Sequence, residues 1–231
     1  MAISDLTSFF SRLVHYPSFN VIYGHRGVGK SSFLFQLALT NLSARKKIII
    51  MPKRSYHIKI ICRLLKGYSK NLRKNLIIKT INDNPRELIL LLARIENDGL
   101  SRCLLILDDV IPLRFYIARE WNQKLARAIG LITPLLLSLL NHEISIWISA
   151  PELSGFPLPR RWQFFIEMTN KFYRLRRIRR IRELFLVKLT NLPKNGDYWD
   201  ITPKDLRIET VLLGRFILTE RGFIPIAQEE S

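Results

Sequence analysis

The sequence is poor in cysteine and has no apolar run long enough to cross a membrane. Its 231 residues include two cysteines, Cys62 and Cys103, and a chain of this length can bury a core without disulfides. We therefore expect no disulfide framework and a reducing, cytoplasmic location. The longest apolar stretch, residues 130–140, is interrupted by polar residues and is much shorter than the roughly 20 residues of a membrane span. The first five residues, MAISD, lack the basic segment of a secretory signal, so no membrane association is expected.

Carboxylates are missing from a long N-terminal part of the chain. No Asp or Glu occurs between Asp5 and Asp83, whereas fifteen Lys or Arg residues fall in this interval. A second basic block, residues 160–182, contains nine Lys or Arg residues and one carboxylate, Glu167. The whole chain has a formal net charge of +18, which indicates a polyanionic partner. We favour nucleic acid over anionic lipid, because the basic runs do not lie on one long amphipathic helix.

Apolar runs alternate with segments of helical periodicity through the first two thirds of the chain. Short apolar runs predict strands at residues 20–23, 47–51, 76–79, 103–107 and 144–149. Helices are expected between them at residues 30–42, 56–65, 85–95 and 120–140. This alternation predicts an α/β fold with a mostly parallel central sheet, helices on both faces and right-handed crossovers.

The last third of the sequence has a different pattern. Strand-like segments are expected at residues 162–175, 184–189, 212–218 and 223–226, with the basic residues 176–182 as a hairpin tip. We expect these strands to extend the same sheet in antiparallel fashion. The sequence thus favours one domain over residues 1–231, with residues 1–18 as a lead-in and residues 160–231 as its β-rich part. A small separate C-terminal domain is the alternative.

A complete phosphate-binding loop motif, G-x-x-x-x-G-K-S, follows the first predicted strand and precedes a helix. Glycines let the backbone approach a phosphate closely, and the amides at the helix N-terminus point at the anion. Lys30 is expected to contact the terminal phosphates, and the Ser31 hydroxyl to hold Mg²⁺. A chance glycine-rich turn is the alternative, which the strand and helix around the motif disfavour. The residues predicted to bind nucleotide are Gly24, His25, Arg26, Gly27, Val28, Gly29, Lys30, Ser31 and Ser32.

Two aspartates, Asp108 and Asp109, close the apolar run at residues 103–107. Phosphate-binding loops use a carboxylate at the end of a neighbouring strand to hold the metal, and Asp108 is the predicted Mg²⁺-side residue. Asp109 is predicted, with Lys30, to act in catalysis by positioning a nucleophile. A simple cap at the strand end is the alternative for either aspartate. The absence of carboxylates before Asp83 leaves few other acids near strand ends, namely Asp109, Glu120, Glu143 and Glu152.

An ordered series of weaker matches resembles the RecA superfamily, specifically the archaeal RadA recombinases and their short, RadB- or RadC-like paralogues. Residues 50–61 (IMPKRSYHIKII) resemble the family's I-D-T-E-G-T-F-R-P-E-R-I, and residues 75–82 (NLIIKTIN) resemble N-I-x-V-A-R-A-Y. Residues 114–119 and 122–125 are similar to the family's R-A-E-Y segment and R-Q-Q-K-L helix. Residues 214–223 (GRFILTERGF) resemble A-x-F-x-I-T-E-x-G-I. The resemblance implies a RecA-like ATPase core that uses ATP and Mg²⁺.

The departures from this family pattern are informative. Lys53 stands where the resemblance places the catalytic Glu, so it implies a weak ATPase. Residues 149–151 (SAP) replace the family's T-N-Q, and both DNA-binding loops are short. The chain also begins at the ATPase core, without the family's helical N-terminal domain. The resemblance therefore implies an accessory paralogue that modulates a RadA-type recombinase in homologous recombination and DNA repair, and an oligomer is compatible with it.

The basic block predicts a phosphate-gripping hairpin, because guanidinium groups bind phosphate oxygens in paired geometry. Nothing in it is suited to reading bases, so sequence-independent binding of DNA, with single strands preferred, is expected. A solvated turn is the alternative. The predicted DNA-binding residues are Arg160, Arg161, Arg174, Arg176, Arg177, Arg179, Arg180 and Arg182.

A second functional class remains open. The same core could serve a regulatory or signalling ATPase that acts on protein partners. Binding of single-stranded DNA, measured against salt, separates the two functions.

Overall fold

The computed structural model describes residues 6–41, 47–52, 55–66, 68–82, 85–110, 123–153, 155–159, 162–166, 168–169, 171–192 and 201–226. Its strands form one sheet in the order β3-β2-β4-β5-β1-β6-β7-β8-β9. The strands are β1 (Ser18–Gly24), β2 (Lys47–Pro52), β3 (Leu76–Ile81), β4 (Leu104–Leu107), β5 (Ser145–Pro151), β6 (Lys171–Ile178), β7 (Ile181–Thr190), β8 (Arg207–Thr219) and β9 (Gly222–Pro225). The helices are α1 (Leu6–Leu13), α2 (Lys30–Thr40), α3 (Ser55–Leu65), α4 (Lys70–Arg73), α5 (Pro85–Asn97), α6 (Gln123–Asn141) and α7 (Trp162–Ile166).

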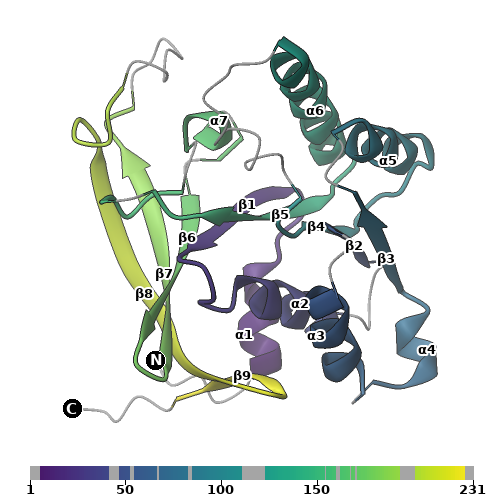
Figure 1. Cartoon of the computed structure of the whole chain (residues 1–231), viewed down its shortest axis with the longest axis horizontal. Helices are drawn as coiled ribbons and strands as arrows, with labels where there is room; N and C mark the ends of the chain where they lie inside the picture. Colours follow the sequence, from purple (N-terminus) through teal and green to yellow (C-terminus); the bar gives the residue numbers. More distant parts are fainter. Residues whose placement is uncertain are drawn as a thin grey trace.

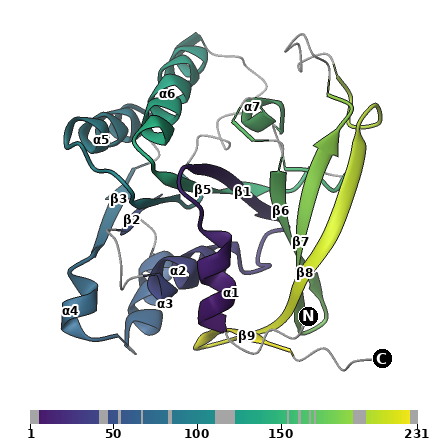
Figure 2. The ribbon, with the colours of Figure 1, turned by 180° about the vertical axis from the view of Figure 1, so that it is seen from behind.

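Six neighbouring strands, from β3 to β6 in the sheet order, pair in parallel. Helices cover both faces of this part: α1, α2 and α3 lie on one side, and α5 and α6 on the other (Figures 1 and 2). Burial on both faces explains the continuous apolar runs in the sequence, since alternate residues of β4 and β5 enter opposite cores. The predicted α/β fold with a mostly parallel sheet is confirmed.

The antiparallel part begins at β6, which pairs in parallel with β1 and antiparallel with β7. Strands β7, β8 and β9 continue the same sheet in antiparallel fashion, as predicted. Figure 1 shows the long strands β7 and β8 running past the end of β1, with β9 lying below α1 and α2. The antiparallel strands therefore reach the helix layer that contains α2.

Two details of the predicted antiparallel part are wrong. Residues 162–166 form α7 instead of a strand, because Phe165 and Ile166 turn into the core on the α5–α6 side. The hairpin tip is also much shorter than residues 176–182. Residues up to Ile178 belong to β6 and residues from Ile181 belong to β7, so only residues 179 and 180 form the turn. Strand pairing thus extends into a segment whose charge suggested a loop.

Within the described residues, no helix is both long and apolar enough to span a membrane. The two cysteines are not paired with each other, since Cys62 is exposed on α3 and Cys103 is buried before β4.

Candidate nucleotide-binding site

The phosphate-binding loop joins β1 to α2, as its motif predicts. Gly24 ends β1 so close to β6 that a Cβ at this position would lie 2.2 Å from the Leu175 carbonyl oxygen. Gly29 caps α2 with a φ of 108°, in the left-handed region that favours glycine. Both glycines are therefore required by the backbone path of the loop.

Lys30, the first residue of α2, folds back over the loop. Its ammonium group donates to the carbonyl oxygen of Gly24 at 2.8 Å and to that of His25 at 3.1 Å. Burial lowers the pKa of Lys30 below the ordinary 10.5, although Asp108, Asp109 and Glu152 act in the opposite direction. The side chain predicted to contact phosphate is thus held against the loop backbone and lies in the field of three carboxylates.

Asp108 and Asp109 follow β4 at the same edge of the sheet. Asp108 is fully buried, and its carboxylate accepts a hydrogen bond of 2.9 Å from the Ser149 hydroxyl of β5. The same Ser149 oxygen accepts a hydrogen bond of 2.7 Å from the Asp109 backbone N–H. Asp109 has a φ of 56°, a left-handed conformation that Asp tolerates. Ser149, which sequence reasoning linked only to a family motif, therefore fixes both aspartates.

The residues present fit a magnesium ion that arrives with a nucleotide. Within the described part of the chain, no group of three or more His, Cys, Asp or Glu side chains could hold a metal alone. Mg²⁺ usually takes one or two protein oxygens and fills the remaining positions with phosphates and waters. The Ser31 hydroxyl and the Asp108 carboxylate are the oxygens of the appropriate type.

The antiparallel strands form a wall against this loop, a feature that sequence reasoning missed. A Cβ on Gly29 would lie 2.8 Å from Leu218 of β8 and 3.2 Å from Phe223 of β9. Buried Gln36 of α2 donates to the Phe223 carbonyl at 3.1 Å and accepts from its N–H at 2.6 Å. Val28 contacts the wall through its carbonyl oxygen, which accepts a hydrogen bond of 2.9 Å from Arg182 of β7.

Comparison with known proteins identifies the architecture. The sequence matches no family model and no curated protein. The crystal structure of the RadB recombinase matches the chain with a TM-score of 0.62 over 92% of each chain, at 16% sequence identity. The chain has the fold of the RadB recombinase. The RecA-like fold implied by the sequence resemblance is therefore confirmed, whereas chemistry has to be argued from the residues of this chain.

Within this RadB-like fold, Glu152 adds a third carboxylate to the site. It follows β5 and is 9% exposed, and its oxygens lie 2.6 Å from Arg174 Nη2 and 3.2 Å from His25 Nε2. Glu143, another acid near a strand end, lies before β5 at the opposite edge and pairs with Arg102. Glu152 therefore connects the phosphate-binding loop, through His25, with β6, through Arg174.

The predicted DNA-binding arginines divide into three groups. Arg160 and Arg161 lie outside the described residues. Three others have protein partners: Arg174 binds Glu152, Arg176 lies 2.9 Å from Glu183, and Arg182 binds the phosphate-binding loop. The remaining three are exposed around the hairpin turn, and they are Arg177, Arg179 and Arg180.

Several other predicted site residues can be located only in part. Lys53 lies outside the described residues. Arg26 is exposed in the loop, whereas Ser31 and Ser32 are half-buried in the first turn of α2. Glu120, another candidate acid, is also outside the described residues.

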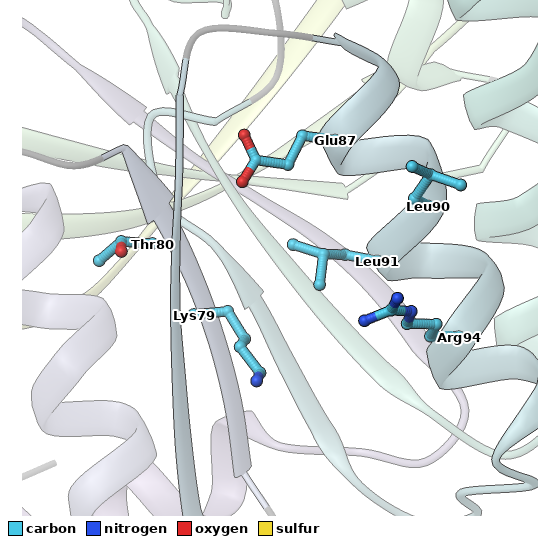
Figure 3. Close-up of a pocket in the computed structure, with 6 residues that line it drawn as sticks. All are labelled: Lys79, Thr80, Glu87, Leu90, Leu91 and Arg94. Carbon is cyan, nitrogen blue, oxygen red and sulfur yellow. The ribbon is translucent and has the colours of Figure 1, made fainter.

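A separate pocket of about 270 Å³ lies between β3 and α5 (Figure 3). It is below the roughly 300 Å³ at which small-molecule sites begin, and the strands β2, β4 and β5 separate β3 from β1 in the sheet. The pocket is therefore distinct from the phosphate-binding loop. Its lining comes from Lys79, Thr80, Glu87, Leu90, Leu91 and Arg94.

Proposed function

We propose that the chain binds ATP with Mg²⁺, binds DNA without sequence preference, and acts as an accessory protein of a RadA-type recombinase. The observation that carries the proposal is the placement of Lys30. It lies on a complete phosphate-binding loop and in the field of the strand-end carboxylate Asp108. This is the combination that phosphate-binding loop ATPases use.

In this proposal the residues of the chain divide the work of nucleotide binding. The loop amides and Lys30 bind the phosphates, and the Ser31 hydroxyl and Asp108 carboxylate hold the magnesium ion. An ion held there would neutralise phosphate charge. Asp109, whose backbone is fixed by Ser149, would position a water molecule.

Isothermal titration calorimetry with ATP and Mg²⁺ tests the nucleotide site. Lys30→Ala removes the cation of the loop and should weaken ATP binding at least tenfold, about 1.4 kcal/mol. Lys204→Ala, at an exposed lysine in the segment before β8, is the matched control and should bind like wild type. Equal affinity in Lys30→Ala and wild type would contradict the assignment.

We further propose that ATP turnover is slow. Lys53 stands where the sequence resemblance places the glutamate that activates water, and a charged lysine cannot accept a proton. Lys53→Glu should raise the turnover rate, whereas Asp109→Ala should abolish residual turnover if Asp109 positions the nucleophile. Steady-state phosphate release measures both effects. A wild-type rate in the usual enzyme range of roughly 1–1000 per second would contradict this proposal.

Binding of DNA is supported by the net charge of +18 and by the three exposed arginines Arg177, Arg179 and Arg180. Their guanidinium groups suit phosphate oxygens. Fluorescence anisotropy with a single-stranded oligothymidylate should give an affinity that falls steeply as salt rises. Absence of binding at low salt would instead favour the regulatory ATPase that acts on protein partners.

A protein partner is supported at the other end of the sheet. Among the described residues, β3 pairs only with β2, and the free edge of a strand can accept a strand from another chain. The neighbouring pocket combines leucines with Lys79 and Arg94 (Figure 3). The immobilised chain should retain a RadA-type recombinase, and Lys79→Pro should abolish this retention. The two results together would support this surface as the recombinase contact.

A further inference from the structure

Arg182 connects the phosphate-binding loop to the turn of the β6–β7 hairpin. Its guanidinium is largely buried, with Arg182 only 7% exposed. The Nε atom donates to the Val28 carbonyl oxygen at 2.9 Å. The Nη1 atom donates to the carbonyl oxygens of Arg180 at 3.2 Å and Ile181 at 3.3 Å. One planar group therefore bridges two segments that are 154 residues apart in the sequence.

A second arginine of the hairpin shares this arrangement. Arg177 lies directly opposite Arg182 in the β6–β7 register, and its Nε donates to the Arg179 carbonyl oxygen at 3.0 Å. Burial lowers the pKa of Arg182, and repulsion from Arg177 lowers it further. The exposed Arg177 thus also helps to hold the turn, and its positive charge repels that of Arg182.

We propose that Arg182 is a positioning residue of the phosphate-binding loop, through which a polyanion bound at the hairpin turn tightens the binding of nucleotide. The inference rests on the proposed binding of ATP and DNA and adds a direct link between the two sites. In this link, a phosphate bound by Arg177 acts on Arg182 through the repulsion between the two arginines and through the turn that both side chains hold, and Arg182 acts on the loop through the Val28 carbonyl.

The sign of the effect follows from these charges. A phosphate that neutralises Arg177 removes a repulsion from Arg182, so the guanidinium can hold the Val28 carbonyl and the turn more firmly. A loop held in this way loses less conformational entropy when it binds the triphosphate. Simple repulsion between DNA and ATP through space has the opposite sign and weakens nucleotide binding. The direction of the effect therefore separates the two mechanisms.

Calorimetric titration of ATP with and without saturating oligothymidylate tests the link in the full-length chain. The oligonucleotide should lower the Kd for ATP by about fivefold or more, at the lower end of usual allosteric couplings, and ATP should lower the Kd for the oligonucleotide by the same factor. In Arg182→Lys the charge remains but one ammonium cannot reproduce the planar bridge, so this factor should fall to about one. Arg207→Ala, an exposed arginine at the far end of β8, should keep the wild-type factor.

Each outcome has a clear meaning. If both ligands bind wild type but neither changes the affinity of the other, or each weakens the other, the link is wrong while the proposed function stands. If ATP or oligonucleotide does not bind at all, the proposed function fails and the link fails with it. Should Arg182→Lys not fold by circular dichroism, Arg177→Gln decides, because it removes the opposing charge from an exposed position. An undiminished factor in the folded variant would overturn the role of these arginines.

Discussion

At Lys30, burial of a charged side chain opposes the field of three nearby carboxylates. Burial has the larger effect and lowers the pKa of the ammonium below 10.5. The two carbonyl oxygens that accept its hydrogen bonds keep the charge in place. In the proposed function, the protonation of Lys30 and the binding of a triphosphate are therefore linked, because the phosphates require the charged form of the lysine.

The lowered pKa predicts the pH dependence of nucleotide binding. As pH rises from neutral towards 10.5, Lys30 loses its proton earlier than an ordinary lysine, and the affinity for ATP should fall over this interval. Calorimetric titrations at a series of pH values measure the loss. In Lys30→Arg the guanidinium stays charged, so its affinity should change little. If the ATP affinities of wild type and Lys30→Arg fall in the same way as pH rises, a group other than Lys30 is responsible for the pH dependence.

Glu152 is a second residue whose environment has a measurable consequence. Glu152→Gln leaves Arg174, which is 23% exposed, without its carboxylate. Breaking a buried pair costs about 3–5 kcal/mol, and because Arg174 is partly solvated we expect a loss of about 2 kcal/mol in the free energy of unfolding. Urea denaturation measures this, with the exposed Glu209→Gln as a control that should change stability by less than about 0.5 kcal/mol. If the two variants have the same free energy of unfolding, the pair of Glu152 with Arg174 does not stabilise the fold.

Among the elements, β9 has more influence on the site than its four residues suggest. It is the last strand of the sheet order, yet it packs against α2, and Gln36 bonds both backbone groups of Phe223. Phe223 also makes an edge-on ring contact with Phe33 of α2 at 5.6 Å. Strand β9 therefore supports α2, the helix that begins at Lys30.

Gln36→Ala tests this support. The substitution leaves the buried N–H and carbonyl of Phe223 without their side-chain partner, at about 1–3 kcal/mol for each unsatisfied group. We expect a total loss of about 2–6 kcal/mol in the free energy of unfolding, together with weaker ATP binding. Asn97→Ala, at an exposed polar position in α5, should leave both quantities unchanged. A fully stable Gln36→Ala protein would mean that α2 does not depend on β9.

Over the whole molecule, the positive charge is not equally available to a ligand. Arg176 and Arg215 flank the buried Glu183, and Arg174 is paired with Glu152. Arg177 at the end of β6 and the turn residues Arg179 and Arg180 remain exposed. Net charge therefore overstates the number of arginines that can contact DNA.

The salt dependence of DNA binding should reveal this difference. Replacing Arg177, Arg179 and Arg180 together by Ala should make the slope of log affinity against log salt shallower, by about 0.7 for each phosphate of single-stranded DNA that these arginines neutralise. Arg176→Ala should change the slope less than any of these three arginines does, because Arg176 is already paired with Glu183. If Arg176→Ala has the larger effect, the division between paired and exposed arginines is wrong. Anisotropy titrations at several salt concentrations supply the slopes.

The sequence by itself determined the parallel half of the sheet and the loop and strand-end carboxylates of the candidate nucleotide site. Its apolar runs are continuous because those strands are buried on both faces, and the loop motif between β1 and α2 is local. Asp108 was predictable for the same reason, since the carboxyl ends of parallel strands share one edge. The role of Lys53 stays a prediction.

The partners of the polar residues were decided only by tertiary structure. Arg182 and Val28, or Gln36 and Phe223, come together through the sheet order and the strand register, and neither pair leaves a local pattern in the sequence. The sequence placed the hairpin arginines on a free tip, but register moved Arg182 inward and left Arg177 outside. Charge in a sequence is a count of residues, whereas available charge depends on which side chains find a partner when distant strands pair.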